Sequence, residues 1–275
     1  MSQTTATFIS KNGQKIFYRN WKPSIAPKAI MVLVHGLNSH SGYYQSFAEQ
    51  LSNNGFIVYA IDLVGRGNSE GERYYISDYQ AVVEDIDQLV NIAQKENSSL
   101  SVFLLGHSAG GVFASVYAVK YQHKLQGLIS ESFAFQVPAP DFALATLKFL
   151  ANFIPHARVV QLKNEDFSRD KEVVSAMNSD PLLAKEKQPT KTMQQLVLAA
   201  AFLKKEMNNI ALPLLIIHGT ADKATRPEGS KYFYDNVSSK DKTFKLYEGH
   251  YHDLLNDLDK ETVIKDILEW LAKRT

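Results

Sequence analysis

The sequence predicts an α/β fold in which a mostly parallel sheet is flanked by helices. Several short apolar runs, such as "AIMVLV" and "FIVYAI", are typical of strands buried on both faces of a sheet. Between these runs, apolar residues recur at helical spacing. Strands and helices therefore alternate along the chain, which is the pattern of a parallel sheet built from strand–helix–strand units.

Each element follows from its own pattern. Two short strands around Asn12-Gly13 predict an N-terminal hairpin, because this dipeptide favours a tight turn. Gly55 closes the first predicted helix. In chain order we expect strands at 29–36, 56–62, 101–105, 125–132, 212–219 and 243–249, helices at 44–53, 79–93 and 109–121, and a further helix after each of the last two strands.

The alternation is interrupted between residues 133 and 209. This segment has several prolines, no clear strand, and helix-like patterns at 141–153 and 192–205. We interpret it as a helical insertion above the sheet and name residues 133–209 the cap. Residues 1–132 and 210–275 then form the core of a single domain.

Composition excludes some chemistry. The chain of 275 residues has a net charge of +1 without a basic stripe, so we expect no nucleic-acid partner. It has no cysteine, which excludes disulfides, thiolate zinc sites and cysteine catalysis. The N-terminus has no signal-peptide pattern, and no run approaches about 18 apolar residues. We therefore expect a cytoplasmic protein, and its oligomeric state is left open.

Ser108 is the candidate nucleophile. It stands between Gly106 and Gly110, where a predicted strand gives way to a helix, as in the G-x-S-x-G nucleophile elbow. Only small residues fit beside so tight a turn, which lifts the hydroxyl over the carboxyl ends of the strands. The N–H of Ala109 points toward the same spot. The alternative is a serine that only caps a helix.

A serine needs a base and an acid, which in this kind of fold follow it in the order acid, then histidine. Asp222 comes just after one predicted strand, and His250 and His252 come just after the last. Asp222 has an alternative role as a turn residue. The two histidines have alternative roles as loop residues or a weak metal half-site, which no further ligand cluster supports. Spacing alone does not choose between them.

The oxyanion hole is expected at the end of the first buried strand. Gly36 lets the backbone turn there, so that the N–H groups of Leu37 and Ala109 face a developing oxyanion. The glycines of "DLVGRGNSEG" do not follow a phosphate-loop spacing, and we interpret that segment as a tight loop. His40 and His107 either line the pocket or hold these loops.

Together these residues resemble the α/β-hydrolase fold, and within it the monoacylglycerol lipase and lysophospholipase-like serine hydrolases. The resemblance implies that Asp222 is the acid, that His252 of Tyr251-His252 is the base, that Leu37 and Ala109 supply the oxyanion hole, and that the cap covers an apolar acyl channel. It runs in order across nearly the whole chain, through "VLVHGLNSHSGYY", "AIDLVGRGNSEGER", "FLLGHSAGG", "NSDPLL", "LLIIHGTADKATRPEGS", "DKTFKLYEGHYHDLLND" and "ILEWL".

The sequence departs from this family at the head-group end of the site. Ser39 and Tyr43 stand where typical monoacylglycerol lipases have an acid and an arginine, and Leu255 stands where eukaryotic members often have another histidine. Ser39, Tyr43 and His107 are our candidate substrate-binding residues.

The functional hypothesis is a serine carboxylic ester hydrolase that cleaves monoacylglycerols or similar single-chain lipid esters through an acyl-enzyme. It needs no metal and no cofactor. Alternatives are a lysophospholipase, a general short-chain carboxylesterase, another acyl or C–C bond hydrolase, or a non-catalytic binding module. The apolar residues at 141–155 line the acyl channel or, alternatively, dock peripherally on a membrane.

Overall fold

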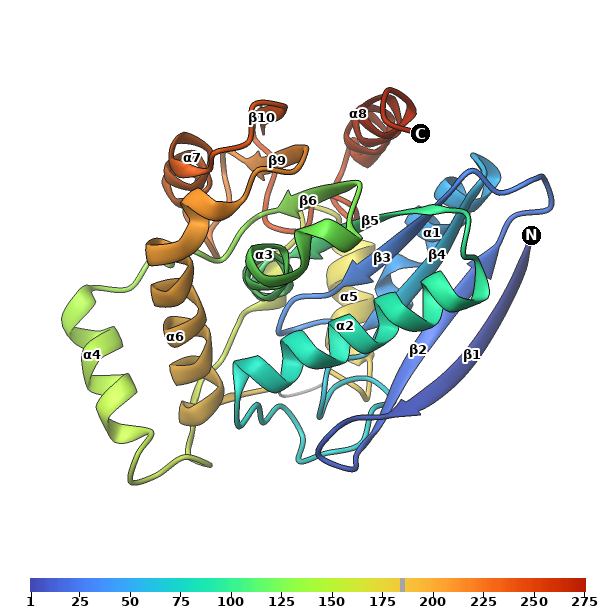
Figure 1. Cartoon of the computed structure of the whole chain (residues 1–275). Coiled ribbons are helices and arrows are strands. Elements are labelled where there is room, and N and C mark those ends of the chain that lie inside the picture. The colour runs from blue at the N-terminus through green and yellow to red at the C-terminus, as the bar shows by residue number, and fades with distance from the viewer. Residues whose placement is uncertain (184–185) are drawn as a thin grey trace.

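The computed structural model describes residues 1–183 and 186–275. Its centre is an eight-stranded sheet in the order β1-β2-β4-β3-β5-β6-β9-β10 (Figure 1). All neighbouring pairs from β4 to β10 are parallel, and only the pairs that involve β2 are antiparallel. The predicted fold class is therefore confirmed. The strands are β1 (Ser2–Ile9), β2 (Lys15–Lys22), β3 (Ala29–Val34), β4 (Phe56–Ile61), β5 (Ser101–His107), β6 (Gly127–Glu131), β9 (Leu214–Gly219) and β10 (Lys242–Tyr247).

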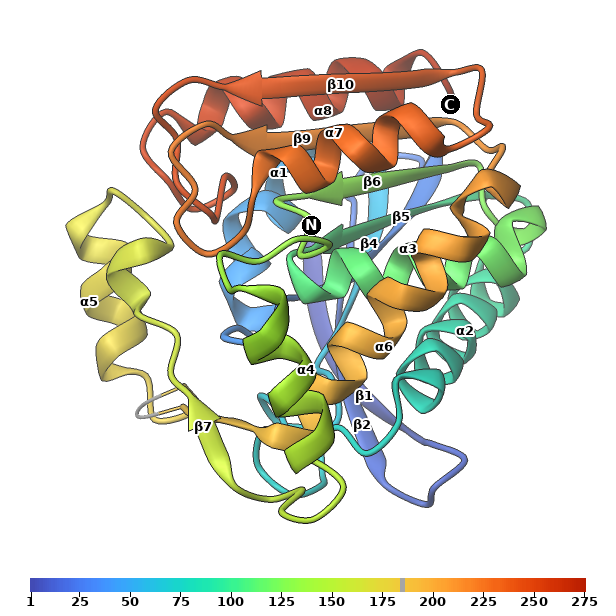
Figure 2. The same ribbon diagram turned by 90° about the vertical axis from the view of Figure 1, so that its left-hand side faces the viewer.

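Helices cover both faces of the sheet. The helices α1 (Gln45–Asn53) and α8 (Lys260–Ala272) pack on one face, where Phe47 and Trp270 join an apolar cluster. The helices α2 (Tyr79–Glu96), α3 (Ala109–Tyr121), α6 (Thr190–Glu206) and α7 (Pro227–Asn236) contribute to a larger apolar cluster on the other face (Figure 2). Every residue of β3 and β4 is buried, as their continuous apolar runs predict.

The cap contributes the remaining elements. These are α4 (Asp141–Leu150), β7 (Arg158–Val160), α5 (Lys171–Ser179) and the short β8 (Gln188–Pro189), followed by α6. The helix patterns at 141–153 and 192–205 correspond to α4 and α6, whereas sequence analysis missed α5, β7 and β8. In Figure 2, β6, β9 and β10 point toward the side of the molecule where α5 lies. The boundaries of the cap stay a prediction, and α6 at its end packs against α3 of the core.

Within the two described ranges, no helix combines the length and the apolar character that crossing a lipid bilayer requires.

Candidate functional site

Ser108 sits on a strained turn between β5 and α3. Its backbone has φ 55° and ψ −121°, a conformation that non-glycine residues rarely adopt. A Cβ atom on Gly110 would lie 2.3 Å from the carbonyl oxygen of Val34, and one on Gly106 would lie 2.4 Å from the carbonyl oxygen of Gly110. Both positions therefore need glycine, and the turn has the geometry that the motif predicts for a nucleophile elbow.

Asp222 and His252 meet beside this turn. The Nδ1 atom of His252 lies 2.8 Å from Oδ2 of Asp222, and both side chains are buried. His250 points elsewhere, with its Nδ1 atom 3.7 Å from Asp257. The alternative that spacing left open is thus resolved geometrically in favour of a contact between His252 and Asp222.

The Asp222 carboxylate is held by several donors. Oδ1 accepts the N–H groups of Ala224 and Thr225 at 2.8 and 2.9 Å, and Oδ2 accepts the hydroxyl of Thr225 at 2.8 Å. A second histidine, His218, places its Nε2 atom 3.0 Å from the same Oδ2. Burial alone would raise the pKa of Asp222, but His252 and His218 hold it well below its usual range. The carboxylate therefore stays charged beside His252.

Neither His218 nor Thr225 was singled out from the sequence. The Nδ1 atom of His218 lies 2.7 Å from the Ser230 hydroxyl on α7, which fixes the ring toward Asp222. Its position four residues before the candidate acid, at the end of a buried strand, was the available signal.

The Nε2 atom of His252 is buried and has no hydrogen-bond partner among the described residues. The Ser108 hydroxyl makes no hydrogen bond to it in this structure, although Ser108 directly follows β5 and His252 lies in the loop after β10. Two rings enclose the imidazole: His107 and Phe167 each have a centroid 4.9 Å from that of His252. Phe167 comes from the cap, and no sequence motif pointed to it.

The loop after β3 lies directly against Ser108. A Cβ atom on Gly36 would be 3.0 Å from that of Ser108. The N–H groups of Leu37 and Ala109 donate to no other group in the part of the chain that the structure describes, so both are available to an oxyanion. The structure thus places the loop that carries Leu37 beside Ser108 and Ala109, and the role of the two N–H groups as oxyanion donors stays a prediction.

His35 orients one of these donors. Its Nε2 atom is 2.9 Å from the N–H of Leu63, which can only donate, so the ring proton lies on Nδ1. Nδ1–H then donates to the carbonyl of Gly36 at 2.6 Å. Because that carbonyl and the Leu37 N–H belong to one trans peptide unit, this bond directs the N–H the opposite way.

The candidate substrate-binding residues have different surroundings. Ser39 and His107 are buried, and the Nδ1 atom of His107 lies 3.0 Å from the Tyr44 hydroxyl. Tyr43 is half-buried and donates to Asp180 at the end of α5, at 3.1 Å. His40 contacts the same carboxylate at 2.9 Å, which favours its loop-holding role. Contact of Ser39, Tyr43 and His107 with a substrate stays a prediction.

A buried polar cluster lies next to the His252 ring, which His107 contacts. His107, Glu131 and Asp253 each place a potential ligand atom within 4.8 Å of the others. Burial raises the pKa of Glu131 far above its usual value, and burial raises that of Asp253 to about 6. A metal ion would require both carboxyls to be deprotonated. Sequence analysis did not single out Glu131 or Asp253, and we assign no catalytic step to this cluster.

A mostly apolar cavity of about 490 Å³ begins beside the elbow, at Ala134, whose N–H donates to the Ser108 carbonyl at 3.2 Å. Ser108, Asp222 and His252 are not among its lining residues. Its walls come from the loop after β6, from α4 and from α6 and include Phe135, Leu144, Met193, Leu196 and Val197, with Lys204 and Arg226 as its charged members.

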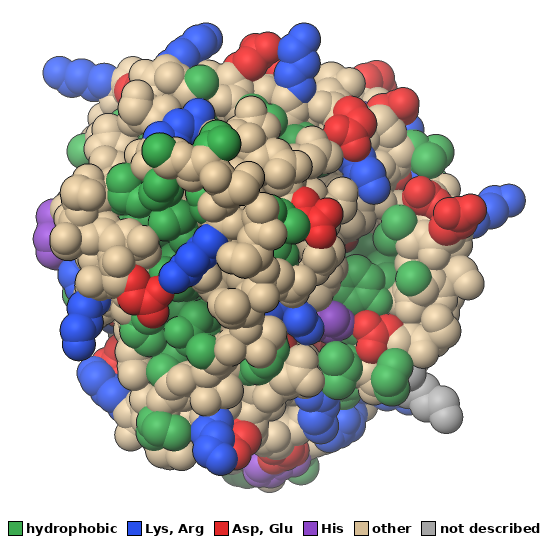
Figure 3. Space-filling view, turned by 90° about the vertical axis from the view of Figure 1, so that its right-hand side faces the viewer, with side chains coloured by type: hydrophobic (Ala, Val, Ile, Leu, Met, Phe, Trp, Pro, Cys, Tyr) green, Lys and Arg blue, Asp and Glu red, His purple; other side chains and the backbone are tan. Residues whose placement is uncertain are grey.

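Charge is evenly distributed on the face shown in Figure 3. Among the described residues of that face, basic and acidic side chains are interspersed, and hydrophobic side chains gather in hollows between them. This arrangement agrees with the net charge of +1.

Comparison with known proteins connects this geometry to a family. The family model for serine aminopeptidase, S33, matches residues 25–259. The chain is 36% identical to the monoglyceride lipase of Rattus norvegicus over 273 residues. The match covers 97% of this chain and 89% of that protein. A crystal structure of Paleococcus ferrophilus monoacylglycerol lipase superposes with a TM-score of 0.84 at 30% identity and covers 100% of both chains. A soluble variant of the Saccharomyces cerevisiae monoglyceride lipase, in complex with a substrate analog, has a TM-score of 0.91 at 25% identity over 100% of this chain and 96% of that one.

Proposed function

This chain belongs to the serine aminopeptidase S33 family of α/β hydrolases, and from this membership we propose that it cleaves monoacylglycerols or similar single-chain lipid esters with a Ser108-His252-Asp222 triad. It is a serine hydrolase similar to monoacylglycerol lipases. The observation that carries the proposal is the 2.8 Å contact between His252 and Asp222 beside the Ser108 elbow.

In the proposed reaction, Asp222 accepts the Nδ1–H of His252 and leaves Nε2 free to accept the Ser108 proton. The Ser108 oxygen attacks the ester carbonyl carbon, and the N–H groups of Leu37 and Ala109 stabilise the negative oxygen. His252 then donates its proton to the leaving alcohol. Water, deprotonated in the same way, releases the acid and restores Ser108. The buried, unpartnered Nε2 atom supports the role of His252 as base.

The proposed acyl site is the cavity that starts at Ala134. A volume of about 490 Å³ lies in the range typical of small-molecule sites, and its largely apolar walls suit a hydrocarbon chain. The cavity lies next to the Ser108 backbone. This position supports transfer of the acyl group to Ser108 while the hydrocarbon chain of the substrate lies beneath the cap. We propose that Tyr43, together with the buried Ser39 and His107, binds the alcohol part of the ester.

The test compares wild type with Ser108→Ala on a panel of p-nitrophenyl esters of short and long chains, a long-chain monoacylglycerol and a lysophospholipid. Wild type should prefer the monoacylglycerol, and Ser108→Ala should lose nearly all turnover and all labelling by a fluorophosphonate while its circular dichroism is unchanged. Substantial esterase activity in the folded variant would overturn the assignment of the nucleophile. Activity confined to short aryl esters would favour a general carboxylesterase, and a preference for the lysophospholipid would favour a lysophospholipase.

We also propose that α4 and the turn after it contact lipid surfaces. Phe142, Phe149, Phe153 and Ile154 are 75, 62, 69 and 46% exposed, whereas Leu144 of the same helix faces the cavity. A group of exposed apolar side chains of this size is costly in water and favourable at a bilayer interface.

Flotation with neutral or anionic liposomes tests this contact. Wild type should co-migrate with the vesicles, and the double variant Phe149→Ser, Phe153→Ser should not. Leu246→Ser is the matched control, because Leu246 is 45% exposed on β10, away from α4. Failure of wild type to float with either vesicle would refute the membrane contact.

A further inference from the structure

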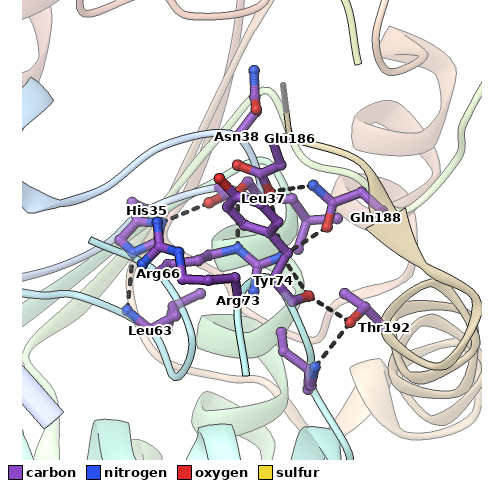
Figure 4. A network of polar contacts seen from close by, with 12 residues as sticks. His35, Leu37, Asn38, Leu63, Arg66, Arg73, Tyr74, Glu186, Gln188 and Thr192 are labelled. Atoms are coloured by element: carbon purple, nitrogen blue, oxygen red, sulfur yellow. Dashed lines mark hydrogen bonds and ion pairs between the residues drawn. The ribbon is translucent and has the colours of Figure 1, made fainter. Parts of the chain in front are cut away.

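Arg66 is a fully buried cation in the loop after β4. Burying a guanidinium costs free energy unless its donors find acceptors. Its Nε atom donates to the carbonyl oxygen of Leu37 at 2.8 Å. On the other side, its Nη2 atom donates to Oε1 of Gln188 at 2.7 Å and to the carbonyl of Tyr74 at 3.3 Å. Arg66 therefore lies between the oxyanion loop and the cap (Figure 4).

The cap side of this contact is itself ordered by a neighbouring acid. The Gln188 side chain donates to Glu186, and the Glu186 carboxylate lies 3.6 Å from Nη2 of Arg66. Glu186 and Gln188 are buried and lie where the cap returns toward α6. The planar fork of an arginine is suited to holding two groups at once, and a lysine is not.

The oxyanion-loop side of the contact bears on the chemistry. The Leu37 carbonyl that Arg66 holds belongs to the peptide after the proposed oxyanion donor, the Leu37 N–H. His35 holds the peptide before it, through the Gly36 carbonyl. The two bonds limit rotation on both sides of Leu37 and so fix the direction of its N–H in the loop that lies against Ser108.

We propose that Arg66 is a positioning residue for hydrolysis: it holds the oxyanion loop through the Leu37 carbonyl and ties the direction of the Leu37 N–H to the seating of Glu186 and Gln188 of the cap. This inference rests on the proposed function, because it assigns a role at the same oxyanion hole. The hydrogen bonds of Arg66 go to Leu37, Tyr74 and Gln188 and not to Ser108. Its effect is felt in the transition state, where the oxygen becomes negative and its donors matter most.

The experiment measures kcat and KM of wild type, Arg66→Met, Arg66→Lys and Gln188→Met on a p-nitrophenyl ester, per active site titrated with a fluorophosphonate. Loss of a whole oxyanion donor lowers kcat about 10²–10³-fold, so a misdirected donor in Arg66→Met should lower it roughly 10–100-fold, with KM within about twofold. Arg66→Lys should recover part of this loss. Gln188→Met should show a smaller loss in the same direction.

An alkyl trifluoromethyl ketone supplies a second readout. It forms a tetrahedral adduct with a serine and places an oxyanion in the hole, so its Ki should rise in Arg66→Met by the factor by which kcat/KM falls. A merely structural role would lower the melting temperature and the titratable fraction but leave kcat per titrated site and this Ki unchanged. That result would overturn the proposal.

The matched control is Gln195→Met. Gln195 is another buried cap glutamine that links to the core, since its Oε1 accepts the N–H of Tyr79 at 3.0 Å. Its kcat should stay within twofold of wild type. Equal losses in Gln195→Met and Gln188→Met would overturn the specific link through Arg66.

If Arg66→Met does not fold, the kcat of Gln188→Met tests the proposal instead. A kcat equal to that of wild type in Gln188→Met then overturns the proposal. A wild-type protein that neither labels nor hydrolyses esters would instead refute the proposed function itself.

Discussion

Replacing His35 with glutamine tests whether a neutral ring holds the oxyanion loop. Burial lowers the pKa of His35 to about 4, against an ordinary histidine value of about 6.5. The folded protein therefore keeps this ring neutral at pH values where the unfolded chain binds a proton. At about 1.4 kcal/mol per pH unit, the difference corresponds to roughly 3 kcal/mol. Because His35 has the lower pKa in the folded protein, it destabilises the folded state as the pH falls. This loss of stability is absent above about pH 6.5 and is complete only below about pH 4.

Glutamine has an NH₂ group that donates and a carbonyl oxygen that accepts, in place of the one donor and one acceptor nitrogen of His35, and it does not titrate. Urea unfolding at pH 4 to 7, followed by tryptophan fluorescence, gives the free energy of unfolding of both proteins. Between pH 7 and pH 4, wild type should lose roughly 3 kcal/mol more than His35→Gln, because the contributions of all other groups cancel in the comparison.

His123→Gln is the control for this comparison, since His123 is exposed, and it should follow the wild-type curve. Parallel curves for wild type and His35→Gln would refute the assignment of a neutral, Nδ1-protonated ring. A steeper loss in His35→Gln than in wild type would contradict the sign of the argument.

Two further predictions concern the triad and the elbow. Asp222→Asn should lower kcat about 10⁴-fold with the fold intact, because an amide favours the wrong tautomer of His252; steady-state kinetics checks this, and a loss below tenfold contradicts the role of the acid. Gly110→Ala should fail to fold or lose more than about 3 kcal/mol of stability, because its Cβ would meet the carbonyl oxygens of Val34 and His35 at 2.3 and 2.4 Å. Thermal melting measures the destabilisation of Gly110→Ala, and a melting temperature close to that of wild type would refute this prediction.

The strand–helix order and the position of the elbow were predictable because both are local patterns. A buried strand requires a continuous apolar run, and the glycines flanking Ser108 form a short motif, although the clash that makes Gly110 necessary is with the carbonyls of Val34 and His35. The choice between His250 and His252 was not a local matter. Both follow the last strand, and only the path of the loop turns one ring to Asp222 and the other toward Asp257.

Sequence analysis missed α5 because little of it is buried. Of its residues only Met177 is buried, so its apolar pattern is weak. Phe167, just before this helix, packs against His252 although no motif connects the two. Contacts of this kind depend on how the cap folds back over the sheet, which residue spacing does not encode.

The residues that hold the proposed oxyanion hole were hidden for a different reason. Within the oxyanion loop, His35 and Arg66 hold backbone carbonyls, those of Gly36 and Leu37, and a carbonyl has no residue type that a motif could reveal. The segment that contains Arg66 looked like a tight loop and nothing more. Yet two successive peptides beside Ser108 are held before any substrate binds, one by a neutral ring and one by a guanidinium. A donor fixed in advance needs no reorganisation when charge develops, which is the condition under which oxyanion stabilisation is largest. Much of the catalytic power of this site should therefore reside in residues that never meet the substrate.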